Sequence, residues 1–382
     1  MKLFNWLRRP IVLSLLGMLA LALIVWIEGP LVAFAGSEPL ASTASRWTVI
    51  AVLFLLWALY WSIRWLAARL VNVRFARDVH AAPQPVPGKQ ESEADVAILK
   101  QRFEAAMKIL RTSRVKGKFG SQYVYQLPWY MFVGAPGTGK TTALVHSGLR
   151  FPLAERLGKQ AIGGVGGTRN CDWWFTDDAV LLDTAGRFTT QDSFAEADKA
   201  SWAGFLQLLR KFRPRRPLNG VIVVLSAADL LQLSATQKAV QAAAVRERLN
   251  ELYTQLNMRF PVYVVVTKCD LLAGFAEFFD DLGRDEREQV WGVTFPFVEN
   301  GGPDQALTDF PVEFGLLEKQ LEANVLRRLQ QETDTRRRAL VYGFPQQFSG
   351  LQSALQGFLG DAFSTSRFEH SALLRGVYFT SG

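Results

Sequence analysis

The chain has 382 residues, a formal net charge of +8 and a composition that is 49% hydrophobic, with 11 tryptophans. This length suits two or three folding units. A basic balance can indicate nucleic-acid binding, but here much of the basic excess flanks apolar segments, where it reports membrane orientation. We therefore expect no nucleic-acid partner. The 2 cysteines and 3 histidines are scattered, so they provide neither a disulfide framework nor a metal-binding constellation.

Two apolar segments near the N-terminus predict membrane spans. Ile11–Ile27 and Trp47–Ile63 contain no charged residue, and helices of this length plus their flanks can cross a hydrocarbon core of about 30 Å. Basic residues precede the first segment and follow the second, so the positive-inside rule places both outer flanks in the cytoplasm. A cleaved signal peptide or a buried core helix are the alternatives, but a second span follows directly and neither segment is amphipathic. Residues 1–77 are thus predicted to form a transmembrane hairpin with a basic juxtamembrane segment, in contact with the lipid bilayer.

A linker is predicted to separate this hairpin from the rest of the chain. Residues 78–95 are rich in proline and polar side chains, which is typical of an extended linker. Val96–Arg111 then carries apolar residues at helical spacing, which predicts an amphipathic helix packed on the domain that follows.

The stretch Gly134–Thr142 reads GAPGTGKTT and follows an apolar run that ends at Val133. It fits the phosphate-binding pattern G-x-x-x-x-G-K-[ST], with a helix predicted to start near Lys140. Glycines let backbone N–H groups turn inward toward phosphate oxygens, Lys140 can reach the β- and γ-phosphates, and the Thr141 hydroxyl can ligate Mg²⁺. A glycine-rich loop that binds nothing is the alternative, which the strand, loop and helix context disfavours.

The segment Asp172–Leu182 predicts a β-hairpin that ends in Asp183-Thr-Ala-Gly186. A carboxylate at the tip of an apolar strand after a phosphate loop is where a residue facing Mg²⁺ belongs, so Asp183 is a candidate; the alternative is a helix or turn cap. Gly186 can bring its backbone N–H to a γ-phosphate where a side chain would obstruct it. Thr168, ahead of the hairpin, stands where a threonine could reach Mg²⁺ and the γ-phosphate.

Two later runs predict a parallel sheet. Gly220–Leu225 and Val262–Thr267 are continuous β-branched runs, as expected of strands buried on both faces, and Ala235–Met258 between them predicts a long helix. Strands that alternate with helices predict an α/β doubly wound sheet, P-loop NTPase-like, with the phosphate loop at the C-terminal end of its first strand.

The second of these strands ends in Thr267-Lys-Cys-Asp270, which resembles the N-K-x-D element with which GTPases hold guanine. Lys268 and Asp270 match, whereas Thr267 replaces the usual asparagine. The order of phosphate loop, D-x-x-G and this element indicates a GTPase-like topology. Many GTPases carry a glutamine directly after D-x-x-G to orient the attacking water, but here the residue is Arg187, which could only stabilise transition-state charge. Gln191 or Asp192 could position water instead.

The candidate residues fall into three overlapping sets. The candidate nucleotide-binding residues are Gly134, Ala135, Pro136, Gly137, Thr138, Gly139, Lys140, Thr141, Thr142, Gly186, Lys268 and Asp270. The candidate metal ligands are Thr141, Thr168 and Asp183. The candidate catalytic residues are Lys140, Asp183 and Arg187. The expected cofactors are ATP or GTP with Mg²⁺.

Beyond Asp270 the strand pattern fades. The predicted helices are Phe275–Asp281, Arg284–Trp291, Phe314–Thr335 and Gln346–Phe363, followed by a strand-like run over Leu373–Thr380. We expect the nucleotide domain to span residues 96–300 and a C-terminal helical extension to span residues 301–382.

Several of these motifs together resemble the IcmF/TssM family. They are the membrane hairpin, the GAPGTGKTT loop, Gly166–Trp174 (GGTRNCDWW), Asp183–Arg187 (DTAGR) and Leu373–Gly382 (LLRGVYFTSG). The resemblance implies a multi-pass subunit of the bacterial inner membrane, in the type VI secretion membrane complex, with its soluble domain in the cytoplasm. The implied partners are a TssL (DotU-like) inner-membrane subunit, other copies of the protein and secretion baseplate components. Family members contact an outer-membrane lipoprotein through a periplasmic domain that this chain lacks, so the chain looks like the N-terminal part of such a protein or a shortened member of the family.

The favoured function is therefore a membrane scaffold whose cytoplasmic domain binds nucleotide and can switch conformation. The alternative is an active ATPase or GTPase that energises secretion or complex assembly. A transporter ATPase of the ABC type is disfavoured, because the chain has no LSGGQ-like signature and D-T-A-G is typical of the GTPase-like class.

Overall fold

The computed structural model describes residues 10–28, 42–78, 100–101, 104, 127–151, 171–190, 195–287, 289–297, 304–365 and 372–381. The chain divides into two compact units, Met1–Ala82 and Pro83–Gly382. The predicted linker over 78–95 and the predicted helix Val96–Arg111 lie almost entirely outside the described residues. The domain bounds predicted from the sequence therefore stay predictions.

The first unit contains two helices, α2 (Pro10–Glu28) and α3 (Thr43–Asp78). They pack against each other, because the indole Nε1 of Trp57 donates to Ser14 Oγ over 3.3 Å and the rings of Trp26 and Trp47 lie 5.3 Å apart. These contacts join the start of α2 to the middle of α3 and the end of α2 to the start of α3. The two helices are therefore antiparallel.

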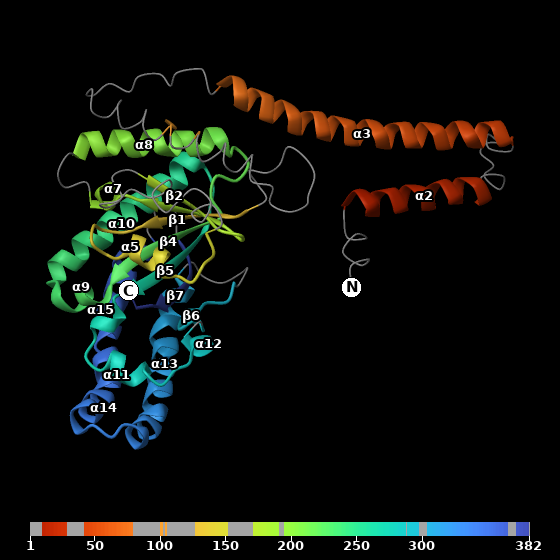
Figure 1. Ribbon diagram of the computed structural model, residues 1–382. Helices are drawn as coiled ribbons and strands as arrows, with labels where there is room; N and C mark the ends of the chain where they lie inside the picture. Colours follow the sequence, from red (N-terminus) through yellow and green to blue (C-terminus); the bar gives the residue numbers. More distant parts are fainter. Residues whose placement is uncertain are drawn as a thin grey trace. The chain divides into compact units, whose positions relative to one another are not determined.

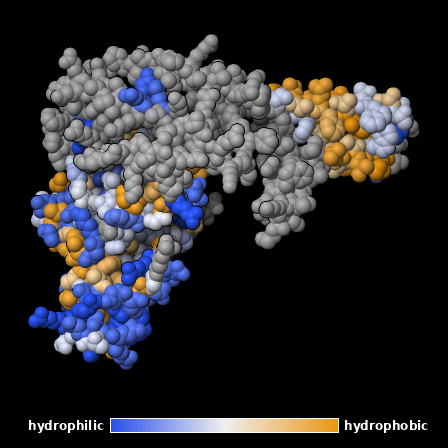
Figure 2. All heavy atoms as spheres, viewed as in Figure 1, coloured by the Kyte–Doolittle hydropathy of each residue, from blue (hydrophilic) through white to orange (hydrophobic). Residues whose placement is uncertain are grey.

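Many of the exposed side chains described on these helices are hydrophobic, and Figure 2 shows part of this surface. By length and composition, one segment among the described residues, Thr43–Tyr60, could cross a membrane, and Gly17–Glu28 is apolar but shorter. The helical pair is thus present, whereas its two predicted membrane spans remain a prediction.

The second unit is built on a seven-stranded sheet in the order β2-β3-β1-β4-β5-β7-β6 (Figure 1). The strands are β1 (Trp129–Val133), β2 (Cys171–Phe175), β3 (Val180–Thr184), β4 (Gly220–Ser226), β5 (Pro261–Thr267), β6 (Gly292–Thr294) and β7 (Leu373–Phe379). Strands β3, β1, β4, β5 and β7 run parallel, and β2 and β6 pair antiparallel at the two edges. A mixed α/β sheet with helices is confirmed, and so is the β2–β3 hairpin predicted ahead of Asp183.

Helices connect and cover these strands. They are α5 (Lys140–Val145), α7 (Gly186–Thr190), α8 (Ala195–Phe212), α9 (Ala227–Gln232), α10 (Ala235–Leu256), α11 (Phe275–Phe279), α12 (Arg284–Arg287), α13 (Gln305–Gln331), α14 (Thr335–Ser349) and α15 (Leu351–Phe363), with the short 3₁₀ helix η3 (Cys269–Leu271). Helix α10 begins at a capping box on Ser234 and ends at Asn257 in the left-handed conformation, so its sequence sets both of its ends. It packs between α8 and α15, while α13 packs on α14 (Figure 1).

The core explains why β4 and β5 are rich in β-branched residues. Val221, Val223, Val262 and Val264 are fully buried, because neighbouring strands flank both β4 and β5 and helices cover the sheet. The β1–β2 side of the core is aromatic instead, with the rings of Trp129 and Trp173 at 5.3 Å in an edge-to-face contact.

The C-terminal part differs from the sequence prediction in several ways, one of which is that the predicted helix Arg284–Trp291 is α12, which ends at Arg287. The predicted helix Gln346–Phe363 is divided between α14 and α15, which meet at Gly350, and α13 begins at Gln305, ahead of the predicted start. The strand-like run that ends the chain is β7, and it lies inside the sheet between β5 and β6. The helices that follow Asp270 are therefore an insertion between two strands of one sheet, and residues 301–382 are not purely a helical extension. Strand pairing over such a sequence distance leaves no periodic pattern, which is why the sequence did not reveal it.

Candidate functional site

The phosphate-binding pattern forms a loop between the end of β1 at Val133 and the start of α5 at Lys140, as predicted. Two of its glycines have left-handed backbones, with φ of 77° at Gly137 and 82° at Gly139. A Cβ atom on Gly134 would lie 2.5 Å from the carbonyl oxygen of Val224 in β4. The conformation and the close packing of this loop thus require glycine at these positions.

The Lys140 side chain is 7% exposed and turns back into the loop. Its ammonium donates to the carbonyl oxygens of Gly134 at 2.7 Å and Ala135 at 2.9 Å. Burial lowers the pKa of Lys140 to about 8, and the nearby Asp183 carboxylate offsets part of that effect. The buried Lys140 ammonium thus bonds to two backbone carbonyls, which the oxygens of an anionic ligand can replace.

Thr141 and Asp183 meet beside this lysine. The Thr141 hydroxyl donates to Asp183 Oδ2 over 2.5 Å, and Asp183 is fully buried. The contact arises because β1 and β3 are parallel neighbours with Phe132 opposite Asp183, so the loop after β1 passes the end of β3. The sequence predicted both residues as ligands of one metal ion, and the structure brings them together.

Gly186 packs directly on the phosphate loop. A Cβ atom at this position would lie 2.4 Å from the backbone nitrogen of Pro136 and 2.9 Å from the carbonyl carbon of Ala135. Three residues on, the hydroxyl of Thr189 in α7 accepts a hydrogen bond of 3.1 Å from the Gly134 N–H. Helix α7 is therefore joined to the phosphate loop at both of its ends.

Thr267 joins the loop from the opposite side. Its buried hydroxyl lies within hydrogen-bond distance of the carbonyl oxygens of Thr138 at 2.6 Å and Leu225 at 3.0 Å. The threonine that replaces the asparagine of the N-K-x-D element thus connects β5, β4 and the phosphate loop. Lys268 follows with a left-handed backbone of φ 59°, and Asp270 is exposed in η3.

Lys268 lies beside Gly139 of the loop. A Cβ atom added to Gly139 would be 3.4 Å from Thr267 Oγ1 and 4.0 Å from Lys268 Cε. The left-handed turn at Lys268 therefore directs its side chain toward the phosphate loop, while the chain continues into η3 and Asp270.

The remaining predicted residues occupy different positions. Pro136, Gly137 and Thr142 are exposed around the loop, and Thr138 is buried with its hydroxyl donating to Ala135 O over 2.9 Å. Thr168, Gln191 and Asp192 lie outside the described residues.

Arg187 is paired within the protein. Its guanidinium bonds the buried carboxylate of Asp198 in α8 over 2.7 Å and lies 5.1 Å from the ring of Phe188. The pair fixes α7 to α8. A catalytic role of Arg187 stays a prediction.

Sequence reasoning missed several supporting residues. The Thr184 hydroxyl donates to Phe132 O over 2.5 Å, Thr189 accepts from the loop, and Asp198 holds Arg187. Thr184 lies within the D-T-A-G-R motif and Thr189 lies just after it, so this motif could have pointed to both residues. Their partners lie far away in sequence, in β1 and in the loop that follows it. No sequence signal pointed to Asp198.

The residues present fit a nucleoside triphosphate with Mg²⁺. A buried ammonium, a glycine-lined loop and a hydroxyl against a carboxylate are the donor set for phosphates and a hard divalent cation. Within the described residues, no group of three or more His, Cys, Asp or Glu side chains could hold a metal ion. Among the described residues, Thr141 and Asp183 are the predicted ligands that would hold the cation.

Comparison with known proteins places the chain in a family. The family model of the IcmF-related N-terminal domain matches residues 195–382. A curated relative, the type VI secretion system component TssM1 of Pseudomonas aeruginosa strain PAO1, is 54% identical over 288 residues, which are 75% of this chain and 26% of that protein. The chain thus spans about a quarter of the length of this relative.

A solved structure of the signal recognition particle receptor SRb-GTP/SRX complex from Chaetomium thermophilum is 22% identical, with a TM-score of 0.25, and covers 38% of this chain and 71% of that chain. A TM-score this low does not support a conclusion about fold or function. The residues that the family model matches include the motif Leu373–Gly382, and the identity to TssM1 extends over 75% of this chain. The chain belongs to the IcmF/TssM family of type VI secretion components.

Proposed function

We propose that this protein is an inner-membrane scaffold subunit of a type VI secretion complex, and that its second unit binds a nucleoside triphosphate as a conformational switch. The observation that carries the nucleotide part is the contact of Thr141 with Asp183 beside the buried Lys140 ammonium. The apolar segment Thr43–Tyr60 and the similarity to TssM1 support the membrane part.

The residues of the site have separate tasks in this proposal. Lys140 exchanges its two loop carbonyls for oxygens of the β- and γ-phosphates. Thr141 and Asp183 hold Mg²⁺, which neutralises phosphate charge when bound. Gly186 offers its backbone N–H to the γ-phosphate, and because it touches the loop backbone, any movement of the loop displaces α7. We therefore expect the conformational change to pass from the phosphate loop through α7 to α8.

The proposed partners follow from the family. They are the lipid bilayer, a TssL/DotU-like inner-membrane subunit, other copies of the protein and secretion baseplate components. We place the protein in the bacterial inner membrane as a multi-pass protein, with its second unit in the cytoplasm.

An active NTPase is the second candidate function. Hydrolysis requires a group that orients the attacking water, and the residue directly after D-x-x-G is Arg187, which is paired with Asp198. We therefore rank a binding switch above an NTPase. Phosphate release by the wild type at the same rate as by Lys140→Ala would exclude the NTPase.

The first experiment measures binding of ribose-labelled fluorescent ATP and GTP, with Mg²⁺, to the full chain in detergent micelles. We expect saturable binding by the wild type and by Lys319→Ala, whose lysine is exposed on α13 and remote from the loop in sequence. Lys140→Ala should lose it, with circular dichroism confirming that the variant is folded. A folded wild-type chain that binds neither nucleotide would overturn the nucleotide part of the proposal.

A further inference from the structure

Helix α13 carries apolar side chains on two of its faces. One face is buried in the second unit and includes Phe310, Phe314, Leu317 and Leu321. The other face is open to solvent: Val312 is 67% exposed, Leu316 is 47% exposed and Leu326 is 73% exposed. A helix on the surface of a globular protein normally turns polar side chains outward. The second apolar face of α13 is therefore a candidate contact surface.

This exposed face repeats with the spacing of a coiled-coil seam. Its positions follow one another in steps of four and three residues, and all of these side chains are exposed: Val312, Leu316, Lys319, Ala323, Leu326 and Gln330. Such a repeat keeps one line of side chains facing a neighbouring helix over several turns. Helix α13 extends to Gln331, so the whole seam is helical. We call these six residues the α13 seam, and its geometry fits another helix.

The order of residues along the α13 seam suits a second copy of itself in the opposite direction. In an antiparallel pair, positions equally far from the middle of the seam lie opposite each other. Leu316 then packs on Leu326 of the second copy at both ends of the contact. Lys319 packs on Ala323 of the second copy, so neither lysine faces the other. A parallel pair would place the two copies of Lys319 against each other inside the seam, which is unfavourable.

The charges beside the α13 seam also favour the antiparallel pair. Glu313 lies beside one end of the seam and Arg327 beside the other, so each glutamate approaches the arginine of the second copy. Arg327 pairs with Asp281 of its own chain over 2.7 Å, but its guanidinium has five N–H donors and can bond two carboxylates. At the middle, each Lys319 lies next to Glu322 of the second copy, so two lysines offset two glutamates. Opposite charges thus meet along the whole contact.

We propose that the α13 seam binds the α13 seam of a second copy of this chain as an antiparallel helix pair. This inference names a surface for the contact with other copies that the proposed function includes. One helix pair buries less area than the lower limit of about 1,200 Å² for stable interfaces, so the contact is weak between chains in dilute solution. Chains anchored in one membrane have a high effective concentration, which favours it.

Cysteine cross-linking of the full chain in lipid vesicles tests the antiparallel geometry. Leu316→Cys combined with Leu326→Cys should give disulfide-linked dimers with copper phenanthroline, because each new cysteine faces the other one of the second copy. Either substitution alone should not, since like positions lie about 15 Å apart along the helix axis, at about 1.5 Å per residue. The two native cysteines are buried. Thr236→Cys combined with Val240→Cys, at exposed positions of α10, is the matched control and should give no dimer.

The flanking charges are tested by energy transfer between fluorescently labelled chains in the same vesicles. Glu313→Arg should weaken the association about tenfold, because two arginines then approach each other at both ends. Glu313→Arg combined with Arg327→Glu exchanges the two charges and should restore the association. A merely structural effect of either substitution would not produce this rescue. Circular dichroism confirms that each variant is folded.

Three outcomes would overturn the inference. Single-cysteine variants that form dimers as readily as the double variant would exclude the antiparallel pair. Energy transfer between wild-type chains, without cross-linking of the double variant, would exclude α13 as the surface while leaving the contact with other copies intact. Absence of both signals, in chains that still bind nucleotide, would overturn the contact between copies and this inference together, and would leave a different protein as the occupant of the seam.

Discussion

The hydroxyl of Thr141 and the carboxylate of Asp183 share a hydrogen bond of 2.5 Å although they are 42 residues apart in sequence. The contact exists because β1 and β3 are parallel neighbours whose ends meet at one edge of the sheet. It places the two predicted metal ligands in direct contact beside Lys140. The arrangement makes several consequences measurable.

Asp183 should make nucleotide binding dependent on Mg²⁺. Asp183→Asn keeps an oxygen that accepts from Thr141 but removes the negative charge that a divalent cation requires. We expect its affinity for GTP with Mg²⁺ to fall by about 10- to 100-fold, toward the affinity in excess EDTA. Asp178→Asn, at an exposed turn position, is the control. Retention of the full Mg²⁺ effect by Asp183→Asn would show that Asp183 is not a metal ligand.

Lys140 should make nucleotide affinity fall as the pH rises above about 8. Its pKa is lowered to about 8 by burial, so the nucleotide-free protein loses this charge above that pH, whereas bound phosphates favour the charged lysine. The dissociation constant should then rise by up to about tenfold per pH unit above 8. Titrations between pH 6.5 and 9.5 measure the effect. Lys140→Arg, which keeps its charge, should show a flat profile, and a flat wild-type profile would contradict the assignment.

The same pKa shift has a consequence for stability without nucleotide. The pKa of Lys140 is lower in the folded state than its usual 10.5, so between pH 8 and 10.5 the unfolded chain holds a proton that the folded chain has lost. The free energy of unfolding should therefore rise across this window, by at most about 3 kcal/mol, relative to Lys140→Met. Below pH 8 both states are protonated and the difference should not vary with pH. Urea unfolding at several pH values tests the sign, and a decrease across the window would refute it.

Gly186 should not tolerate a side chain. A Cβ atom would lie 2.4 Å from the backbone nitrogen of Pro136, so Gly186→Ala must displace the phosphate loop or α7. We expect a loss of about 1–3 kcal/mol in the free energy of unfolding, together with weaker nucleotide binding.

The matched control is Gly357→Ala in α15, where a Cβ atom would meet nothing within 4 Å. That substitution should stabilise the protein by about 0.5–1 kcal/mol, because alanine suits a helix interior better than glycine. Urea unfolding followed by tryptophan fluorescence compares the two. Equal effects of the two substitutions would mean that Gly186 has no steric role.

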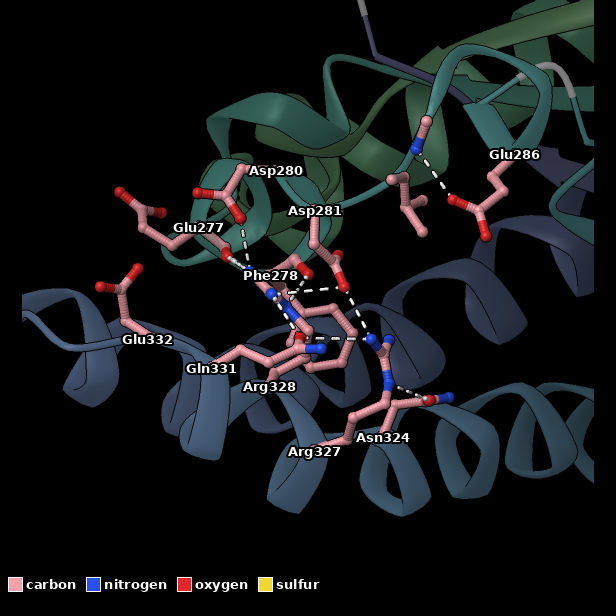
Figure 3. Close-up of polar contacts among 12 residues, drawn as sticks. Glu277, Phe278, Asp280, Asp281, Glu286, Asn324, Arg327, Arg328, Gln331 and Glu332 are labelled. Carbon is pink, nitrogen blue, oxygen red and sulfur yellow. Dashed lines mark hydrogen bonds and ion pairs between the residues drawn. The ribbon is translucent and has the colours of Figure 1, made fainter.

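Arg328 should hold the helical insertion together (Figure 3). Its guanidinium is buried and donates to the carbonyl oxygens of Phe278 at 2.8 Å and Glu277 at 2.7 Å, and it also pairs with Asp280 and Asp281. Arg328→Met leaves the end of α11 without these donors. Because the two carboxylates are partly exposed, we expect a loss of about 2–4 kcal/mol in the free energy of unfolding.

The neighbouring Arg327 provides the control for this network. It also pairs with Asp281, over 2.7 Å, but its side chain is 49% exposed. Arg327→Met should therefore cost less than about 1 kcal/mol. Urea unfolding of both variants measures the two losses in the free energy of unfolding. Comparable losses would show that the burial of Arg328 does not contribute to stability.

Local sequence patterns were sufficient for many elements of the second unit. The glycine loop before Lys140, the hairpin before Asp183 and the β-branched strands β4 and β5 were predicted because each depends on neighbours in sequence, on glycine or on continuous burial. The meeting of Lys140, Thr141 and Asp183 could also be expected, since parallel strands bring their carboxyl ends to one edge. The division between α14 and α15 was missed, because apolar spacing continues through Gly350.

The sequence by itself thus determined the phosphate loop, the carboxylate at the end of β3, the lysine and aspartate after β5 and the family to which the chain belongs. Only the tertiary structure decided that β7 lies beside β5, that Thr189 and Thr267 join the phosphate loop, and that Thr380 bonds the backbone next to Asp270. The physical reason is that hydrogen bonds between segments far apart in sequence depend on how the strands are ordered in the sheet. That order leaves no periodic trace in the residues that form the bonds.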